Sequence, residues 1–186
     1  MHRILISACL LGQKVRYDGA DKFCDSALLP RWTKEGRLLP LCPEVAGGFP
    51  VPRAPAEISN AQGGRDVLNR KASVFERSGR NVTAGYIAGA QAALQLVKTH
   101  GVRVAILKEG SPSCGSGYTY DGSFSGGTTQ KPGVTAALLE ENGVFVFSEL
   151  ELVGADALIR QLEASGSRPA SCWPGNFFHR PAANSP

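Results

Sequence analysis

The sequence predicts an α/β protein with an open, mostly parallel sheet, helices on both faces in a Rossmann-like arrangement, and Gly/Ser-rich loops at the carboxyl ends of the strands. Short apolar runs at residues 3–8, 102–107 and 144–147 are typical of buried strands. Helical patterns lie between and after these runs. Strand–helix alternation of this kind is typical of parallel sheets joined by right-handed crossovers.

The first third of the chain supplies two strands and one short helix. Residues 3–8 form the first apolar run, residues 26–36 predict a helix that stops at a glycine, and residues 37–41 predict the second strand. Pro40 weakens the second strand, because proline is poorly tolerated in the middle of a sheet.

A proline-rich stretch and an irregular segment follow. Four prolines between residues 43 and 55 predict an extended loop on the surface. Residues 57–80 show only a weak pattern, for which we expect a β-hairpin that leaves the main sheet.

Residues 81–101 give the strongest helical signal. Asn81 suits the N-cap and Gly101 suits the position after the last turn. His100 lies in that last turn, where a cation is favourable, so we expect it to be a surface residue. One apolar face is predicted at helical spacing: Val82, Tyr86, Ala90, Ala93 and Val97.

The remainder continues the alternation. A long Gly/Ser loop covers residues 109–132, a helix is expected over 133–142, and a final helix over 149–164. We therefore expect an α/β domain in residues 1–150, followed by a C-terminal helix and Pro/Ser-rich tail in residues 151–186.

Composition indicates a globular protein of 186 residues, with 42% hydrophobic and 19% charged residues and a net charge of +4. There is no run of four Lys or Arg residues, which argues against a nucleic-acid-binding protein. There is also no apolar run long enough for a membrane span and no signal-peptide pattern. We expect a cytoplasmic location.

Three of the five cysteines follow predicted strands. Cys9 ends the first strand, Cys42 ends the second, and Cys114 lies just beyond the strand at 102–107. Because the carboxyl ends of parallel strands meet at one edge of a sheet, we expect these thiols to share a site. The alternative is that they are buried, inert side chains. Cys24 and Cys172 fall elsewhere.

The three thiols are compatible with more than one chemistry. The paired C-x-x-C spacing of structural zinc is absent, and a catalytic zinc with three thiolates is less usual. A cubane iron–sulfur cluster with three cysteine ligands would leave one iron open as a Lewis acid. A third possibility is that Cys114 is a nucleophile, although none of the three histidines lies in an evident site loop.

The residues beside the thiols add polar groups. Glu44 follows Cys42 by two positions and is either a surface turn residue or an acid–base group. Ser111 and Ser113 precede Cys114 in SPSC, and they either stabilise the turn or contact a ligand. The triplet YDG occurs at residues 17–19 and 120–122, as two loop corners or as a pair that positions substrate.

Four segments, in order, closely resemble the thiouracil desulfurase family over residues 2–150: SACLLGQKVRYDG, LCPEVAGGFPVPRAPAEI, KEGSPSCGSGYTYDGSFSG and GVTAALLEENGVFVFSE. The resemblance implies a [4Fe–4S] cluster held by Cys9, Cys42 and Cys114. It implies non-redox removal of sulfur from thiolated uracil-type bases, with the sulfur bound by the open iron and replaced by water. It assigns proton transfer to Glu44, and a hydrogen bond to the substrate to Ser111 or Ser113.

Two other functions fit the residues less well. One is a Rossmann-like module that binds a nucleotide or anion, with purely structural cysteines. The other is sulfur delivery to RNA, which the absence of a basic cluster argues against. The expected partner is therefore a small thiolated nucleobase, with no nucleic acid and no membrane, and the oligomeric state stays open.

Overall fold

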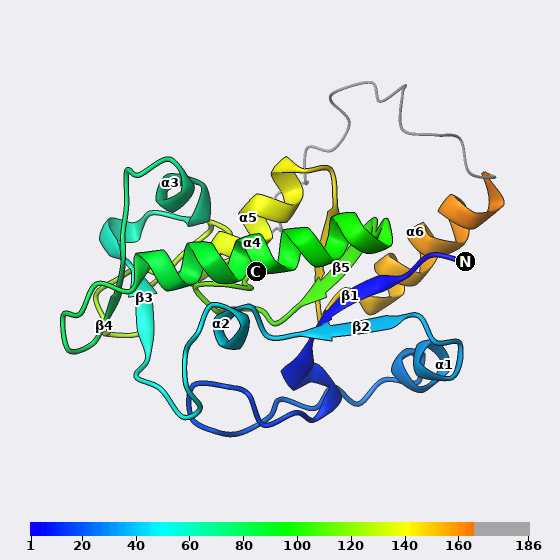
Figure 1. The fold of residues 1–186 in the computed structure, drawn as a ribbon, viewed down its shortest axis with the longest axis horizontal. Coiled ribbons are helices and arrows are strands. Elements are labelled where there is room, and N and C mark those ends of the chain that lie inside the picture. The colour runs from blue at the N-terminus through cyan, green and yellow to red at the C-terminus, as the bar shows by residue number, and fades with distance from the viewer. Residues whose placement is uncertain (166–186) are drawn as a thin grey trace, which may run out of the picture.

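The computed structural model describes residues 1–165 of the chain; Cys172 and the predicted tail lie outside this range. Its centre is a four-stranded sheet in the order β2-β1-β5-β8, in which every neighbouring pair is parallel (Figure 1). The predicted fold class is confirmed. The strands are β1 (Ile4–Ser7), β2 (Leu38–Leu41), β5 (Val104–Leu107) and β8 (Phe145–Ser148).

Helices cover both faces of this sheet, and the long helix α4 crosses in front of it in Figure 1. On one face lie α1 (Leu28–Lys34) and α6 (Leu152–Ala164). On the other lie α4 (Thr83–His100) and α5 (Val134–Glu141). The helices predicted at 26–36, 81–101, 133–142 and 149–164 are all present, with ends shifted by a few residues.

Alternation along the strands explains why both faces are covered. In β1, Ile4 and Ile6 pack with Trp32 of α1 and Ile159 of α6, whereas Leu5 packs in the opposite core with α4 and α5. Successive side chains of a strand point to opposite faces, so a fully apolar strand must be buried on both.

Pro40 lies within β2, opposite Ile6 of β1. The strand forms nevertheless because β2 is at the edge of the sheet. An edge strand needs ladder hydrogen bonds on one side only, so a residue without an N–H group is tolerated there.

The predicted hairpin is formed by β3 (Ala56–Ile58) and β4 (Val74–Glu76), which pair antiparallel. The chain between them contains a short helix, α3 (Gly64–Leu68), that the weak sequence pattern did not predict. The hairpin packs with α3 and the first half of α4 in a third core cluster.

The sequence predicts an extended loop for the proline-rich stretch, and this prediction is wrong for its first four residues. The stretch begins with one helical turn, α2 (Pro43–Ala46), in which Pro43 occupies the first position. Proline is favoured there because its fixed φ suits the helix and its missing N–H would have had no partner. Single turns also occur at η1 (Ala8–Leu11) and η2 (Ser59–Ala61), and the short strands β6 (Thr119–Tyr120) and β7 (Thr128–Thr129) pair within the Gly/Ser loop.

Helix α4 has the predicted apolar face and ends. The five residues predicted for its apolar face are buried. Gly101 adopts the left-handed conformation after the last turn, and the Asn81 side chain accepts a hydrogen bond from Thr83 N–H, although Val82 occupies the cap itself. His100 is exposed, as expected. In the part of the chain described, no helix combines the length and apolarity needed to cross a bilayer.

One acidic residue ties the last helix to the start of the sheet. Glu163 of α6 accepts hydrogen bonds from Arg37 Nη1 at 2.7 Å and from the backbone N–H of His2 at 3.0 Å. The hydrogen bond from Arg37 is the main reason that the pKa of Glu163 falls to about 2.

We expect Glu163→Gln to reduce the free energy of unfolding near neutral pH by about 1 kcal/mol. A depressed carboxyl pKa adds stability above the unfolded value, and that stability is lost as pH falls towards about 2. Urea unfolding at pH 7 and pH 3 should show a difference from wild type that shrinks in acid. Glu141→Gln, on the exposed end of α5, is the control. An equal deficit at both pH values would contradict the ion-pair explanation.

Candidate active site

Three cysteines lie at the carboxyl edge of three adjacent strands. Cys9 lies in η1 directly after β1, Cys42 follows β2, and Cys114 lies in the loop after β5. All three line a single cavity of about 520 Å³, and Cys24 does not. Cys9 and Cys114 also contact the cores on the two faces of the sheet, so both thiols lie between packed apolar side chains and the cavity.

Burial controls the protonation of these thiols. It raises the pKa of Cys9 to about 11, with a further contribution from Cys42. The pKa values of Cys42 and Cys114 are raised as well, again chiefly by burial. At Cys114 the hydrogen bond from Ser7 opposes this rise in pKa, whereas the charges of Glu44, Cys42 and Cys9 add to it.

A thiol with a raised pKa is a poor nucleophile at neutral pH, because the thiolate is the reactive form. The interpretation of Cys114 as an isolated nucleophile is therefore disfavoured. A bound metal would instead displace the protons and stabilise the thiolates. Within residues 1–165, no group of three or more His, Cys, Asp or Glu side chains is arranged to hold a single metal ion.

Glu44 lies in the first turn of α2 and points into the same cavity. Its Oε2 accepts a hydrogen bond from Arg53 Nε at 2.6 Å, and its Oε1 accepts one from Ser111 Oγ at 3.2 Å. Only 12% of its side chain is exposed, and only 5% of the Arg53 side chain. The ion pair therefore offsets the cost of placing a carboxylate in a largely buried wall.

The two serines of SPSC have different positions. Ser111 lines the cavity and contacts Glu44. Ser113 is buried and not part of the cavity wall, and its hydroxyl is hydrogen-bonded to Thr135 Oγ1 at 2.8 Å. The structure brings Ser111 to the site and places Ser113 in the contact between the loop and α5.

Sequence reasoning missed two residues that contact or adjoin Glu44. Arg53 lies in the proline-rich stretch, where an isolated arginine carries no distinctive signal. The sequence pattern places Tyr86 only on the apolar face of α4, yet it also lines the cavity. Burial, and next the carboxylate of Glu44, raises the pKa of Tyr86 well above its ordinary value, so Tyr86 stays a neutral hydroxyl.

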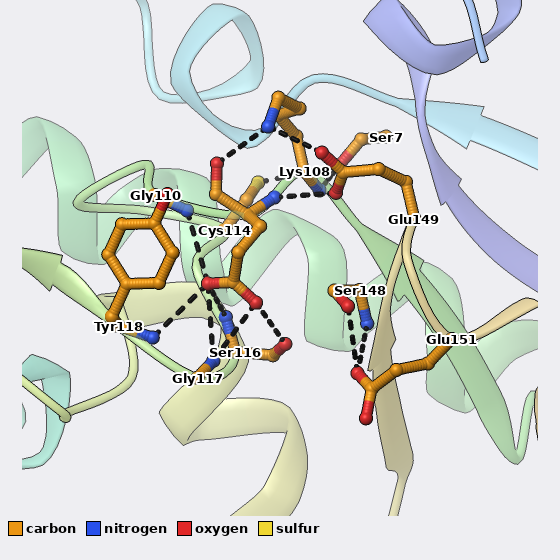
Figure 2. Close-up of polar contacts among 11 residues, drawn as sticks. Ser7, Lys108, Gly110, Cys114, Ser116, Gly117, Tyr118, Ser148, Glu149 and Glu151 are labelled. Atoms are coloured by element: carbon orange, nitrogen blue, oxygen red, sulfur yellow. Dashed lines mark hydrogen bonds and ion pairs between the residues drawn. The ribbon is translucent and has the colours of Figure 1, made fainter. Parts of the chain in front are cut away.

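Ser7 is a third residue that the sequence did not single out. Its hydroxyl donates to Cys114 Sγ at 3.6 Å and accepts a hydrogen bond from the Lys108 N–H at 3.0 Å (Figure 2). The hydroxyl thus bridges the ends of β1 and β5. It is 2% exposed, so it interacts with the sulfur without competition from solvent.

Exposed or half-buried aromatic side chains form one part of the cavity wall, which we call the outer wall. Tyr17 and Tyr120, from the two YDG triplets, both contribute to it, together with Phe124. Phe124 has a left-handed backbone conformation, with φ of 55°, and Glu57 Oε2 accepts its N–H at 3.0 Å. A wall of this kind suits a planar ring.

Two glycines allow α2 to approach α4 closely and so determine where Cys42 and Glu44 lie. A Cβ atom on Gly89 would come within 2.0 Å of the Pro43 carbonyl oxygen, and one on Gly47 within 2.2 Å of the Gly85 carbonyl oxygen. Neither position can accept a side chain unless the helices move apart.

The chain is similar to known proteins over most of its length. The sequence profile of 2-thiouracil desulfurase matches residues 4–151. The uncharacterized protein YbbK of Bacillus subtilis (strain 168) is 45% identical over 149 residues, which cover 80% of this chain and 97% of YbbK. A solved structure described as the [4Fe–4S]-dependent thiouracil desulfidase TudS is similar, with a TM-score of 0.79 and 46% identity over 87% of this chain and 99% of that one.

We expect Gly89→Ala to destabilise the protein by about 1–3 kcal/mol, because the added methyl group would overlap the backbone of Pro43. Thermal unfolding should show a lower midpoint. Gly154→Ala in α6 is the matched control, since the nearest atom to its Cβ would be 3.6 Å away and alanine favours helix. If both variants unfolded at the wild-type temperature, the close approach of α2 to α4 would not be required.

Proposed function

Because the chain belongs to the 2-thiouracil desulfurase family, we propose that it hydrolyses the carbon–sulfur bond of a thiolated uracil-type base without redox chemistry. The products are the oxygenated base and hydrogen sulfide, with water supplying the oxygen. The observation that carries this proposal is that Cys9, Cys42 and Cys114 line one cavity with the paired Glu44 and Ser111.

The donor set fits a [4Fe–4S] cluster. Thiolates are the usual ligands of such clusters, and they bind different irons, so they lie farther apart than the ligands of one ion. Three thiols from three strand ends line one cavity, and within residues 1–165 no group of three or more His, Cys, Asp or Glu side chains could hold a single metal ion. The similarity to the [4Fe–4S]-dependent TudS supports the same cofactor here.

Cys9, Cys42 and Cys114 would hold the cluster, and its fourth iron would act as a Lewis acid towards the sulfur of the substrate. The chain itself supplies the walls of the site. Ser7 donates a hydrogen bond to Cys114 Sγ and fixes the direction of that thiol. Pro43 stiffens the turn after Cys42, and Pro112 stiffens the turn before Cys114.

Glu44 is the proton carrier in this proposal. Its carboxylate lies on the cavity wall and can accept a proton from the water that attacks the carbon. Arg53 holds one carboxylate oxygen and Ser111 donates to the other, which orients the group. Ser111 is also the serine placed to exchange this bond for one to the substrate, whereas Ser113 is engaged with Thr135.

The substrate in this proposal is a free base. The aromatic outer wall suits a planar ring, and the sequence has no run of basic residues that would bind a nucleic acid. The reaction needs no electron donor, and we place it in the cytoplasm. The alternative of a nucleotide- or anion-binding module with structural cysteines gives no reason for three thiols to line one cavity.

Iron and sulfide content tests the ligand set. After anaerobic reconstitution, Cys9→Ser, Cys42→Ser and Cys114→Ser should each lose most of the bound iron, because a hydroxyl is a weak ligand for iron in such clusters. Cys24→Ser is the matched control: this thiol is half-buried and outside the cavity, so iron should stay at the wild-type level. Full loading of the Cys42→Ser protein would rule out the three-ligand proposal.

Turnover of 2-thiouracil tests the role of Glu44. Glu44→Gln should bind the cluster normally and lose about 10²–10⁴-fold in kcat, because the amide cannot accept the proton. Loss of thiouracil absorbance and release of sulfide would both be followed, with Glu141→Gln as the control outside the cavity. Turnover at the wild-type rate by a fully loaded Glu44→Gln protein would remove Glu44 from the proton path.

A further inference from the structure

We propose that Glu109 is a positioning residue, whose carboxylate holds the turn of residues 111–115 in the geometry that presents Ser111 and Cys114 to the cavity. The inference rests on the proposed function in one respect, namely that Cys114 is a cluster ligand. Neither the sequence patterns nor the comparisons assign a role to Glu109.

The Glu109 carboxylate accepts hydrogen bonds from four backbone amides and one hydroxyl. Oε1 accepts the N–H groups of Gly110 at 3.1 Å, Ser116 at 3.0 Å and Tyr118 at 3.2 Å. Oε2 accepts Ser116 Oγ–H at 2.8 Å, and the Gly117 N–H is shared between both oxygens at 3.1 and 3.2 Å. Figure 2 shows these donors converging on one carboxylate.

These donors lie on both sides of the turn. Gly110 immediately precedes Ser111, and the other donors come from residues 116–118, just after the turn. A single side chain therefore connects the two ends of the segment that carries Ser111 and Cys114. Residues 108–118 contain no helix or strand, so these contacts substitute for the missing backbone ladder.

The opposite side of the turn is held by the start of α5. Val134 N–H donates to the Pro112 carbonyl at 2.9 Å, and Thr135 N–H donates to the Ser113 carbonyl at 2.8 Å. The turn is thus held between the first amides of a helix and the carboxylate of Glu109. Because α5 supplies its contacts independently, the fold does not depend on Glu109 alone.

Glu109 is itself held by Glu149, the residue after β8, and by Lys108, the residue before it in the chain. Its N–H donates to Glu149 Oε2 at 2.8 Å, and its carbonyl accepts Lys108 Nζ at 2.8 Å, which also pairs with Glu149 (Figure 2). No cation is paired with the Glu109 carboxylate within residues 1–165. Within the described residues, amide and hydroxyl dipoles compensate its charge.

The carboxylate lines the cavity, which raises the question of whether it carries protons. Five donors occupy an acceptor that has about four lone-pair sites. A proton taken from a substrate would have to displace one of these hydrogen bonds. The geometry therefore assigns Glu109 a positioning role and leaves proton transfer to Glu44.

The turn links Glu109 to the reacting groups through Ser111. Ser111 Oγ accepts the N–H groups of Ser113 at 3.1 Å and Cys114 at 3.2 Å, and it donates to Glu44 Oε1 at 3.2 Å. A displacement of the turn changes the position of a cluster ligand and breaks the contact to the proton carrier. Loss of Glu109 should therefore affect both cluster retention and turnover.

The test compares Glu109→Gln with Glu151→Gln. Glutamine at position 109 replaces one carboxylate oxygen by an NH₂ group. That group cannot accept hydrogen bonds, so the bonds that the replaced oxygen accepted are lost. Glu151 is the matched control, because its carboxylate accepts the N–H and hydroxyl of Ser148 at the end of β8, away from the cavity (Figure 2). Three measurements would be made on the full chain. They are the rate of cluster loss to a chelator, the kinetic constants (kcat per bound cluster, and KM), and amide hydrogen exchange.

For Glu109→Gln we expect cluster loss about 10–100-fold faster than wild type, and a fall in kcat per bound cluster larger than the change in KM. Faster exchange should be confined to residues 110–118. Glu151→Gln should match wild type in all three measurements. A lower melting temperature with wild-type cluster loss and wild-type kcat would overturn the proposal, because it would show a merely structural role.

A second variant guards against a Glu109→Gln protein that does not fold. Ser116→Ala removes only the hydroxyl bond to Oε2, so smaller changes in the same direction are expected, and their absence would overturn the proposal. If the wild-type protein binds a cluster but does not act on thiouracil, the proposed substrate fails, and chelator release still tests Glu109. If no cluster binds, amide exchange in residues 110–118 still shows whether the carboxylate holds the turn.

Discussion

Parallel pairing of three adjacent strands is the constraint on which the site depends. In the order β2-β1-β5, each strand runs in the same direction, so the residues that follow them emerge at one edge. Along the chain, 33 residues separate Cys9 from Cys42 and 72 separate Cys42 from Cys114, and the parallel topology brings all three to one cavity. If one strand were reversed, its cysteine would be carried to the opposite edge.

Burial of the three thiols has opposite effects on folding and on loading. The raised pKa values mean that the empty site is neutral, so folding does not require three negative charges to be buried side by side. In the proposed cluster site, each thiol would lose its proton to become a ligand, and the metal would supply the stabilisation that water cannot. In the proposed site, the burial that makes Cys114 a poor nucleophile would also favour a strongly thiophilic partner.

The sequence was informative where local pattern and topology agree. The apolar strands, the amphipathic helix α4 and the three strand-end thiols follow from periodicity and from the rule that parallel strands share an edge. Helices α2 and α3 were missed because four or five residues give no periodic signal, and their stability comes from packing against α4 and α5. Ser7, Arg53, Tyr86 and Glu109 were missed for a related reason. Ser7 bonds to Cys114, 107 residues away, whereas Arg53 and Glu109 bond to groups within nine residues, in irregular segments where spacing does not indicate which side chains meet.

The glutamates in the cavity wall show why residue type alone does not assign chemistry. Glu57 accepts the N–H groups of Gly122 and Phe124 and so holds the loop that carries Phe124. Glu109 accepts four amides and a hydroxyl, and Glu44 alone of the three is bonded only by side chains, from Arg53 and Ser111. A side-chain hydroxyl can rotate to another acceptor, whereas a backbone amide cannot leave without moving the chain. Glu44 could therefore exchange a partner during a reaction while the other two remain engaged, and this difference in donors separates the proposed proton carrier from the carboxylates that shape the site.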